Sequence, residues 1–177
     1  MKILTTDIGE PIQNPDEIKM KSRAIITDNE GKILIGNYGG VYLLPGGSID
    51  AGENPNDTIL RELREETGLD FQQLKSFAKI RYFQNSYPTR EGRTIDRLLI
   101  TYYYIIGREK DAIKHDRKLT EKEIKDGFEL KYYSVEEIGR MLEQNQTENP
   151  RNQYFNKEIK TIMEHYRREK LLSDVER

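Results

Sequence analysis

The chain has 177 residues, a length that suits one domain with one core. Its 29 Lys and Arg against 31 Asp and Glu give a net charge of −2, so no overall basic field favours nucleic acid as a partner. Cysteine is absent, which excludes disulfides, thiolate zinc sites and cysteine nucleophiles. No apolar window approaches about eighteen residues and no secretion signal is recognisable, so we expect a cytoplasmic protein that does not span a membrane.

Strands are predicted from the start of the chain. Apolar runs at residues 23–27 and 32–36 flank the turn sequence DNEG and predict a hairpin. Later runs rich in β-branched and aromatic residues predict further strands, at residues 41–44, 77–84, 94–107 and 128–135. The charged connection between residues 107 and 128 is too long for a bare turn, and we expect part of it to be a helical turn.

Three helices are predicted. The first is bounded at residues 55–67 by Asn54 as N-cap, Pro55 at the first helical position and Gly68 as a left-handed C-cap. A second begins near residue 135, and a third covers residues 153–170. Strands that precede and follow one inserted helix, with helices returning at the end, indicate the α+β class.

The first predicted helix carries an acidic face. Glu62, Glu65 and Glu66 fall within an arc of about 100°, whereas the apolar side chains lie on a different face. Like charges at these spacings cost a helix a few tenths of a kcal/mol each. A divalent cation would offset that cost, because Mg²⁺ or Mn²⁺ prefers carboxylate oxygens. The alternative is an ordinary solvated acidic face.

The residues around this helix resemble a known motif. The motif is the Nudix box. Its pattern is Gly, five residues, Glu, seven residues, Arg-Glu, an aliphatic residue, any residue, Glu-Glu, any residue, Gly and an aliphatic residue. The chain matches it at Gly47, Glu53, Arg61, Glu62, Leu63, Glu65, Glu66, Gly68 and Leu69. The resemblance implies an αβα sandwich with a mixed sheet, in a single domain over residues 1–177. About 20 N-terminal residues and the helix at 153–170 would then be additions to it.

The resemblance also implies roles for individual residues. Glu65 and Glu66 would be the principal ligands of Mg²⁺ or Mn²⁺, and Arg61 would orient a glutamate by ion pairing. The implied metal-binding set is Gly47, Glu53, Glu62, Glu65 and Glu66. A carboxylate accepts the proton of the attacking water. Members of the family place this base in the box or on a late loop, so Glu62, Glu121, Glu123 and Glu129 stay candidates.

Outside the box the chemical signals are weaker. Tyr87, Arg90 and Arg93 follow a predicted strand, and their side chains suit base stacking and phosphate binding. The alternative is a hairpin with core aromatics and a basic tip. The apolar spacing of the last helix predicts a cap on the domain or an element of a homodimer.

The implied function is Mg²⁺-dependent hydrolysis of a pyrophosphate bond in a nucleoside diphosphate linked to another moiety. Examples of such substrates are a dinucleoside polyphosphate, ADP-ribose or a nucleotide sugar. Two alternatives stay open. One is a house-cleaning nucleoside triphosphate pyrophosphohydrolase, and the other is a nucleotide-sensing module that binds without hydrolysis. Each takes a small nucleotide as its partner.

Overall fold

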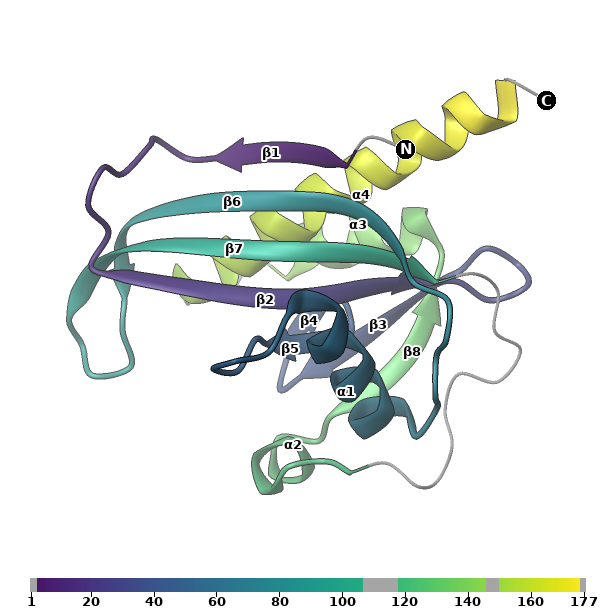
Figure 1. Ribbon diagram of the computed structural model, residues 1–177, viewed down its shortest axis with the longest axis horizontal. Helices are drawn as coiled ribbons and strands as arrows, with labels where there is room; N and C mark the ends of the chain where they lie inside the picture. Colours follow the sequence, from purple (N-terminus) through teal and green to yellow (C-terminus); the bar gives the residue numbers. More distant parts are fainter. Residues whose placement is uncertain (1–2, 107–117, 146–149, 176–177) are drawn as a thin grey trace.

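The computed structural model describes residues 3–106, 118–145 and 150–175 (Figure 1). The order of strands and helices along the chain is close to the predicted one. The elements are β1 (Leu4–Ile8), β2 (Glu17–Ile26), β3 (Ile33–Tyr38), β4 (Val41–Leu43), β5 (Gly46–Ser48), α1 (Pro55–Thr67), β6 (Lys75–Pro88), β7 (Thr94–Ile106), α2 (Glu121–Lys125), β8 (Glu129–Tyr133), α3 (Val135–Gln144) and α4 (Pro150–Val175).

The strands form two sheets. The larger has the order β1-β6-β7-β2-β5, and the smaller has the order β4-β3-β8. The larger sheet is mixed, because β1 pairs with β6 and β2 with β7 in parallel, whereas β6 and β7 are antiparallel. The register that matters most for the site is that of β2 and β5, which places Lys21 opposite Ser48 and Ser22 opposite Gly47.

The predicted hairpin at residues 23–36 is only partly correct. The turn forms, since the Asp28 amide donates to the Lys32 carbonyl at 3.0 Å and Thr27 bridges Ile33. Beyond the turn the strands diverge, because β2 pairs with β7 and β5 while β3 pairs with β4 and β8. The local sequence specifies the turn, and pairing with distant strands decides which sheet each arm joins.

Helices cover both faces of the larger sheet. Figure 1 shows α1 on one side of the strands and α3 and α4 on the other. The alternation of side chains along β2 explains this arrangement. Ile25 belongs to a core cluster with Ile162 of α4, whereas Ile26 belongs to a second cluster with Ile59 and Leu63 of α1. The structure is therefore the expected αβα sandwich with a mixed sheet and a C-terminal helix.

The N-terminal residues contribute more to the sheet than the sequence indicated. We expected about 20 additional residues there, but residues 4–8 form the edge strand β1 and β2 begins at Glu17. Residues 4–7 and 17–20 are exposed or partly exposed, so these segments lack the buried apolar run by which a strand is recognised. The last helix is likewise longer than the predicted residues 153–170. No helix in residues 3–106, 118–145 and 150–175 has the length and apolar character to cross a bilayer.

Candidate active site

Helix α1 is fixed at both ends as predicted. The Asn54 side chain accepts a hydrogen bond from the Asp57 amide at 2.9 Å, and Pro55 occupies the first turn. Gly68 has a φ of 73° and donates its amide to the Arg64 carbonyl. Only glycine adopts this conformation without strain, so the helix ends there. The caps therefore set where the acidic residues of the helix stand.

Glu66 points into the protein. Its side chain is only 2% exposed and accepts hydrogen bonds from the Tyr38 hydroxyl and, at 3.1 Å, from the Gly46 amide. Burial raises the pKa of this carboxyl from 4.5 to about 8, although the Tyr38 hydrogen bond and the charge of Arg23 oppose the change. A buried acid with so little compensating charge favours a nearby cation.

Glu62 lies against Gly47 in the short strand β5. A β-carbon at Gly47 would come within 2.3 Å of the Glu62 carboxylate, so this close approach requires glycine. The Glu62 side chain is 15% exposed, and burial raises the pKa of its carboxyl while Arg61 lowers it. The carboxylate is thus held directly beside the backbone of Gly47.

Arg61 is the centre of an ion-pair network. Its Nε and Nη2 donate to the two oxygens of Glu53 at 2.8 and 3.0 Å, a bidentate arrangement. Its Nη1 donates to Glu62 at 2.9 Å and lies 3.5 Å from Glu65. Hydrogen bonds from Arg61 and Thr58 lower the pKa of the Glu53 carboxyl to about 2. Arg61 therefore links three acids of the motif, Glu53, Glu62 and Glu65.

The acids differ in orientation, although they share one arc of the helix. Glu66 is buried, Glu62 faces Gly47, and Glu65 is 38% exposed beside Arg61. In the part of the chain that the structure describes, no three acidic or histidine side chains converge as a ready coordination set. The donors nevertheless suit a divalent cation chemically, because they are carboxylate oxygens beside a backbone turn and one of them is buried. The metal-ligand roles of Gly47, Glu53, Glu62, Glu65 and Glu66 stay predictions.

The late-loop acids lie on or beside α2. Glu123 caps this helix by accepting from the Thr120 amide at 2.7 Å, and its charge raises the pKa of Glu62. Glu121 is exposed in the first turn of α2, and Glu129 is exposed on β8. The Lys118 amide donates to the Glu65 carbonyl at 2.8 Å, which ties this segment to α1. The identity of the base stays open, with Glu123 close enough to influence Glu62.

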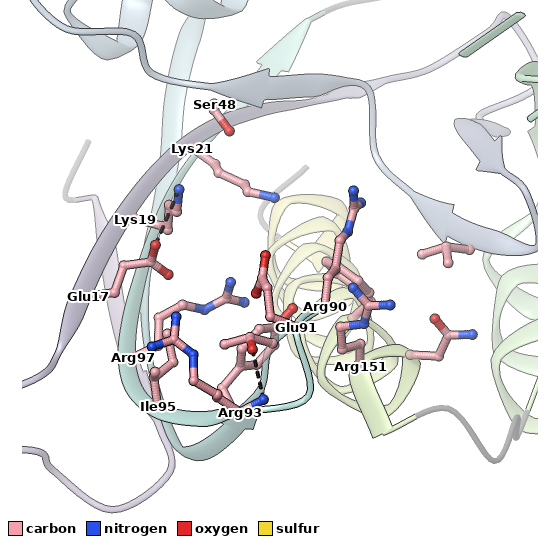
Figure 2. Close-up of a pocket in the computed structure, with 15 residues that line it drawn as sticks. Glu17, Lys19, Lys21, Ser48, Arg90, Glu91, Arg93, Ile95, Arg97 and Arg151 are labelled. Atoms are coloured by element: carbon pink, nitrogen blue, oxygen red, sulfur yellow. Dashed lines mark hydrogen bonds and ion pairs between the residues drawn. The ribbon is translucent and has the colours of Figure 1, made fainter. Parts of the chain in front are cut away.

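A cavity of about 610 Å³ adjoins the motif. Tyr87, Arg90 and Arg93 all line it, as does Ser48, whose carbonyl accepts from Arg61 at 3.4 Å. We call it the basic cavity, because its wall also includes four cationic side chains that the sequence did not single out: Lys19, Lys21, Arg97 and Arg151. Figure 2 shows these side chains around the opening, from β2, the β6–β7 hairpin and α4.

The aromatic ring of Tyr87 is already in contact with other side chains. It is 8% exposed, with the Arg97 guanidinium carbon 3.5 Å from its ring centroid and the Tyr154 ring centroid at 5.4 Å. Arg97 is also held by donation to Gln84 at 2.7 Å. The structure thus places Tyr87 at the cavity wall in a position that orients Arg97, while its predicted stacking on a base stays a prediction.

Comparison with known proteins agrees with the motif. The family model described as NUDIX domain matches residues 19–157. An RNA pyrophosphohydrolase of Gluconacetobacter diazotrophicus is 43% identical over 58 residues, which cover 27% of this chain and 35% of the relative. The 8-oxo-dGTP diphosphatase of Escherichia coli is 33% identical over 64 residues, covering 36% and 42%. The chain thus spans less than half of the length of these curated relatives.

A solved structure gives the same fold. A MutT protein of Bacillus halodurans superposes with a TM-score of 0.50 and 17% identity, over 77% of this chain and 79% of that one. A MutT structure from a study of Aliivibrio salmonicida and Vibrio cholerae gives 0.45 and 18%, over 69% and 82%. The family match covers most of the chain and includes the whole motif. The chain therefore belongs to the NUDIX domain family.

Proposed function

We propose that the chain hydrolyses a pyrophosphate bond in a nucleoside diphosphate linked to another moiety, with Mg²⁺ or Mn²⁺ as cofactor. The observation that carries this proposal is the position of Ser48. It lines the basic cavity and also accepts a hydrogen bond from Arg61, the residue that links Glu53, Glu62 and Glu65. Carboxylates suited to a metal and cations suited to phosphate thus meet at one turn of the chain.

Each group of residues in the candidate site has a separate proposed role. Glu62, Glu65 and Glu66 with the Gly47 carbonyl would hold the cation, and Arg61 keeps Glu53 and Glu62 in place. A divalent ion at such a site neutralises pyrophosphate charge and makes water more acidic. Glu62 or an acid of α2 takes the proton of the attacking water. The basic cavity orients the rest of the substrate.

One of the curated relatives favours a second candidate, hydrolysis of a nucleoside triphosphate. It is named an 8-oxo-dGTP diphosphatase, and the other is named an RNA pyrophosphohydrolase. Both names describe cleavage within a phosphate chain, which is the same bond chemistry on a different substrate. The third alternative, a sensing module, is disfavoured because every carboxylate of the motif is present.

The test is a substrate panel with the phosphomonoester products separated and measured by chromatography, in Mg²⁺ and then in Mn²⁺. We expect turnover of diphosphate compounds. We also expect Glu66→Gln to lower kcat on the order of 10²-fold, because the proposed metal site, which stabilises charge in the transition state, loses a carboxylate. Glu136→Gln, an exposed acid in the first turn of α3, is the matched control. Thermal stabilisation by the compounds without formation of these products would refute hydrolysis and favour sensing. The cytoplasmic location, the single-domain organisation and the homodimer stay predictions.

A further inference from the structure

The basic cavity concentrates positive charge on an otherwise slightly acidic chain. Six Lys and Arg side chains line it against two carboxylates, those of Glu17 and Glu91, whereas the whole chain has a net charge of −2. Arg90 and Arg93 stand at the exposed tip between β6 and β7, whereas Lys21 of β2 and Arg97 of β7 are partly buried (Figure 2). Such a surplus attracts polyanions and focuses the field within the cavity.

Two cationic side chains lie over aromatic rings at the cavity wall. Arg97 lies over the Tyr87 ring at 3.5 Å, and the Lys21 ammonium is 5.8 Å from the centroid of Phe155. Both distances are within the range of cation–π attraction. The rings therefore hold positive groups in position, and these groups occupy faces on which a nucleobase would otherwise stack.

Lys21 shows that the cations repel one another. Burial, and after it the charges of Arg23, Arg97 and Lys19, lower the pKa of its ammonium to about 8. Of the groups acting on Lys21, the carboxylate of Glu158 has the opposite effect. Glu158 is buried, accepts a hydrogen bond from Tyr103 and does not line the cavity. A bound anion would relieve the repulsion.

Building on the proposed function, we propose that the basic cavity binds the part of the substrate remote from the cleaved bond and that this part carries several phosphate groups of its own. The guanidinium groups of Arg90 and Arg93 at the hairpin tip suit one phosphate group, and the cations of Lys21 and Arg97 suit another. The volume of about 610 Å³ is that of a small-molecule site. The occupant is therefore a small phosphorylated metabolite.

The bond chemistry is unchanged by this assignment. The oxygen of water bonds to one phosphorus of the pyrophosphate, and the bridging P–O bond breaks with its electron pair left on the departing phosphate. The proton of the water passes to a carboxylate and then to solvent. The phosphates in the basic cavity take no part in the reaction, so they act on binding and orientation alone.

A matched substrate pair tests the assignment. Guanosine 5′-triphosphate and guanosine 5′-triphosphate 3′-diphosphate share the base, sugar and 5′ chain, and they differ in the remote phosphates. Only cleavage of the 5′ chain is counted, by chromatography of the products, because the 3′-diphosphate contains a further pyrophosphate bond. We expect kcat/KM to be higher for the second by about tenfold or more, mainly through KM, because charged hydrogen bonds to phosphate strengthen binding. The double variant Arg90→Gln, Arg93→Gln should reduce this ratio to near one. Arg140→Gln, an exposed cation of α3, removes one positive charge outside the cavity and should leave the ratio intact.

Four other results are decisive. Equal kcat/KM for the two nucleotides in an active enzyme would overturn the assignment, as would a ratio that survives the double variant. Faster turnover of a 5′-triphosphorylated RNA oligonucleotide than of either nucleotide would overturn it in favour of RNA. Inositol hexakisphosphate, a polyanion with no pyrophosphate bond, separates the two proposals by calorimetry. Binding that the double variant loses, without hydrolysis of any diphosphate, would support the cavity assignment and refute the proposed function.

Discussion

Glu66 gives the sharpest prediction, because it is an acid buried with little compensating charge. The groups that face it are the Tyr38 hydroxyl, the Arg23 guanidinium and the Glu62 carboxylate. Its pKa rises from 4.5 to about 8 on folding, so the folded state binds its proton more tightly than the unfolded state. The stability that this proton contributes is complete below pH 4.5 and is lost as the pH rises toward 8. The metal-free protein should therefore be least stable at alkaline pH.

The magnitude follows from linkage. With these two pKa values, ionisable Glu66 costs about 1 kcal/mol of unfolding free energy at pH 5 and about 3 kcal/mol at pH 7. Glu66→Gln keeps the shape and leaves an oxygen that can accept from the Gly46 amide. Between pH 5 and pH 7, the free energy of unfolding should thus fall by about 2 kcal/mol less in the variant than in the wild type.

The assay is urea denaturation in EDTA at a series of pH values, for the wild type, Glu66→Gln and the exposed control Glu136→Gln. The difference between wild type and Glu66→Gln isolates the contribution of this one carboxyl, since every other titrating group is shared. Parallel pH profiles for the wild type and Glu66→Gln would refute the buried, raised-pKa state. So would a wild type that gains stability relative to Glu66→Gln as the pH rises.

Three further predictions concern the same turn and helix. Gly47→Ala should lower kcat by at least about tenfold, because its β-carbon displaces the Glu62 carboxylate; steady-state kinetics that match wild type would contradict this. Mg²⁺ should raise the melting temperature of the wild type by mass action but not that of the Glu65→Gln, Glu66→Gln double variant, and a surviving response would place the ion elsewhere. Asn54→Ala should cost about 1 kcal/mol of stability in denaturant titration, and an unchanged midpoint would exclude a capping role.

The sequence predicts local features of the fold well. The bounds of α1 follow from Asn54, Pro55 and Gly68, because caps act within a few residues of the helix end. The start of β2 was missed, since residues 17–20 are exposed or nearly so and lack a buried apolar run. The split of β2 and β3 into different sheets was also missed, because it depends on pairing with β7 and β8 far along the chain.

The candidate site shows the same division. The motif residues could be placed on one helix from their spacing, but the inward direction of Glu66 depends on Tyr38 and Gly46, which spacing does not reveal. Lys19 and Lys21 are two residues apart on β2, so their side chains lie on the same face of the sheet. A predicted strand that began at residue 17 would have revealed this. Arg151 reaches the basic cavity from α4, a contact that only the tertiary structure brings about.

The central claim is that the chain cleaves a pyrophosphate bond by attack of water at phosphorus. The most direct measurement is turnover of a nucleoside diphosphate compound in H₂¹⁸O with Mg²⁺, followed by mass spectrometry of both products. The account predicts one ¹⁸O atom in a phosphate group of one product, at a rate that falls on the order of 10²-fold in Glu66→Gln. Absence of cleavage by the wild type, or label on the carbon-bound oxygen of the second moiety, would contradict it.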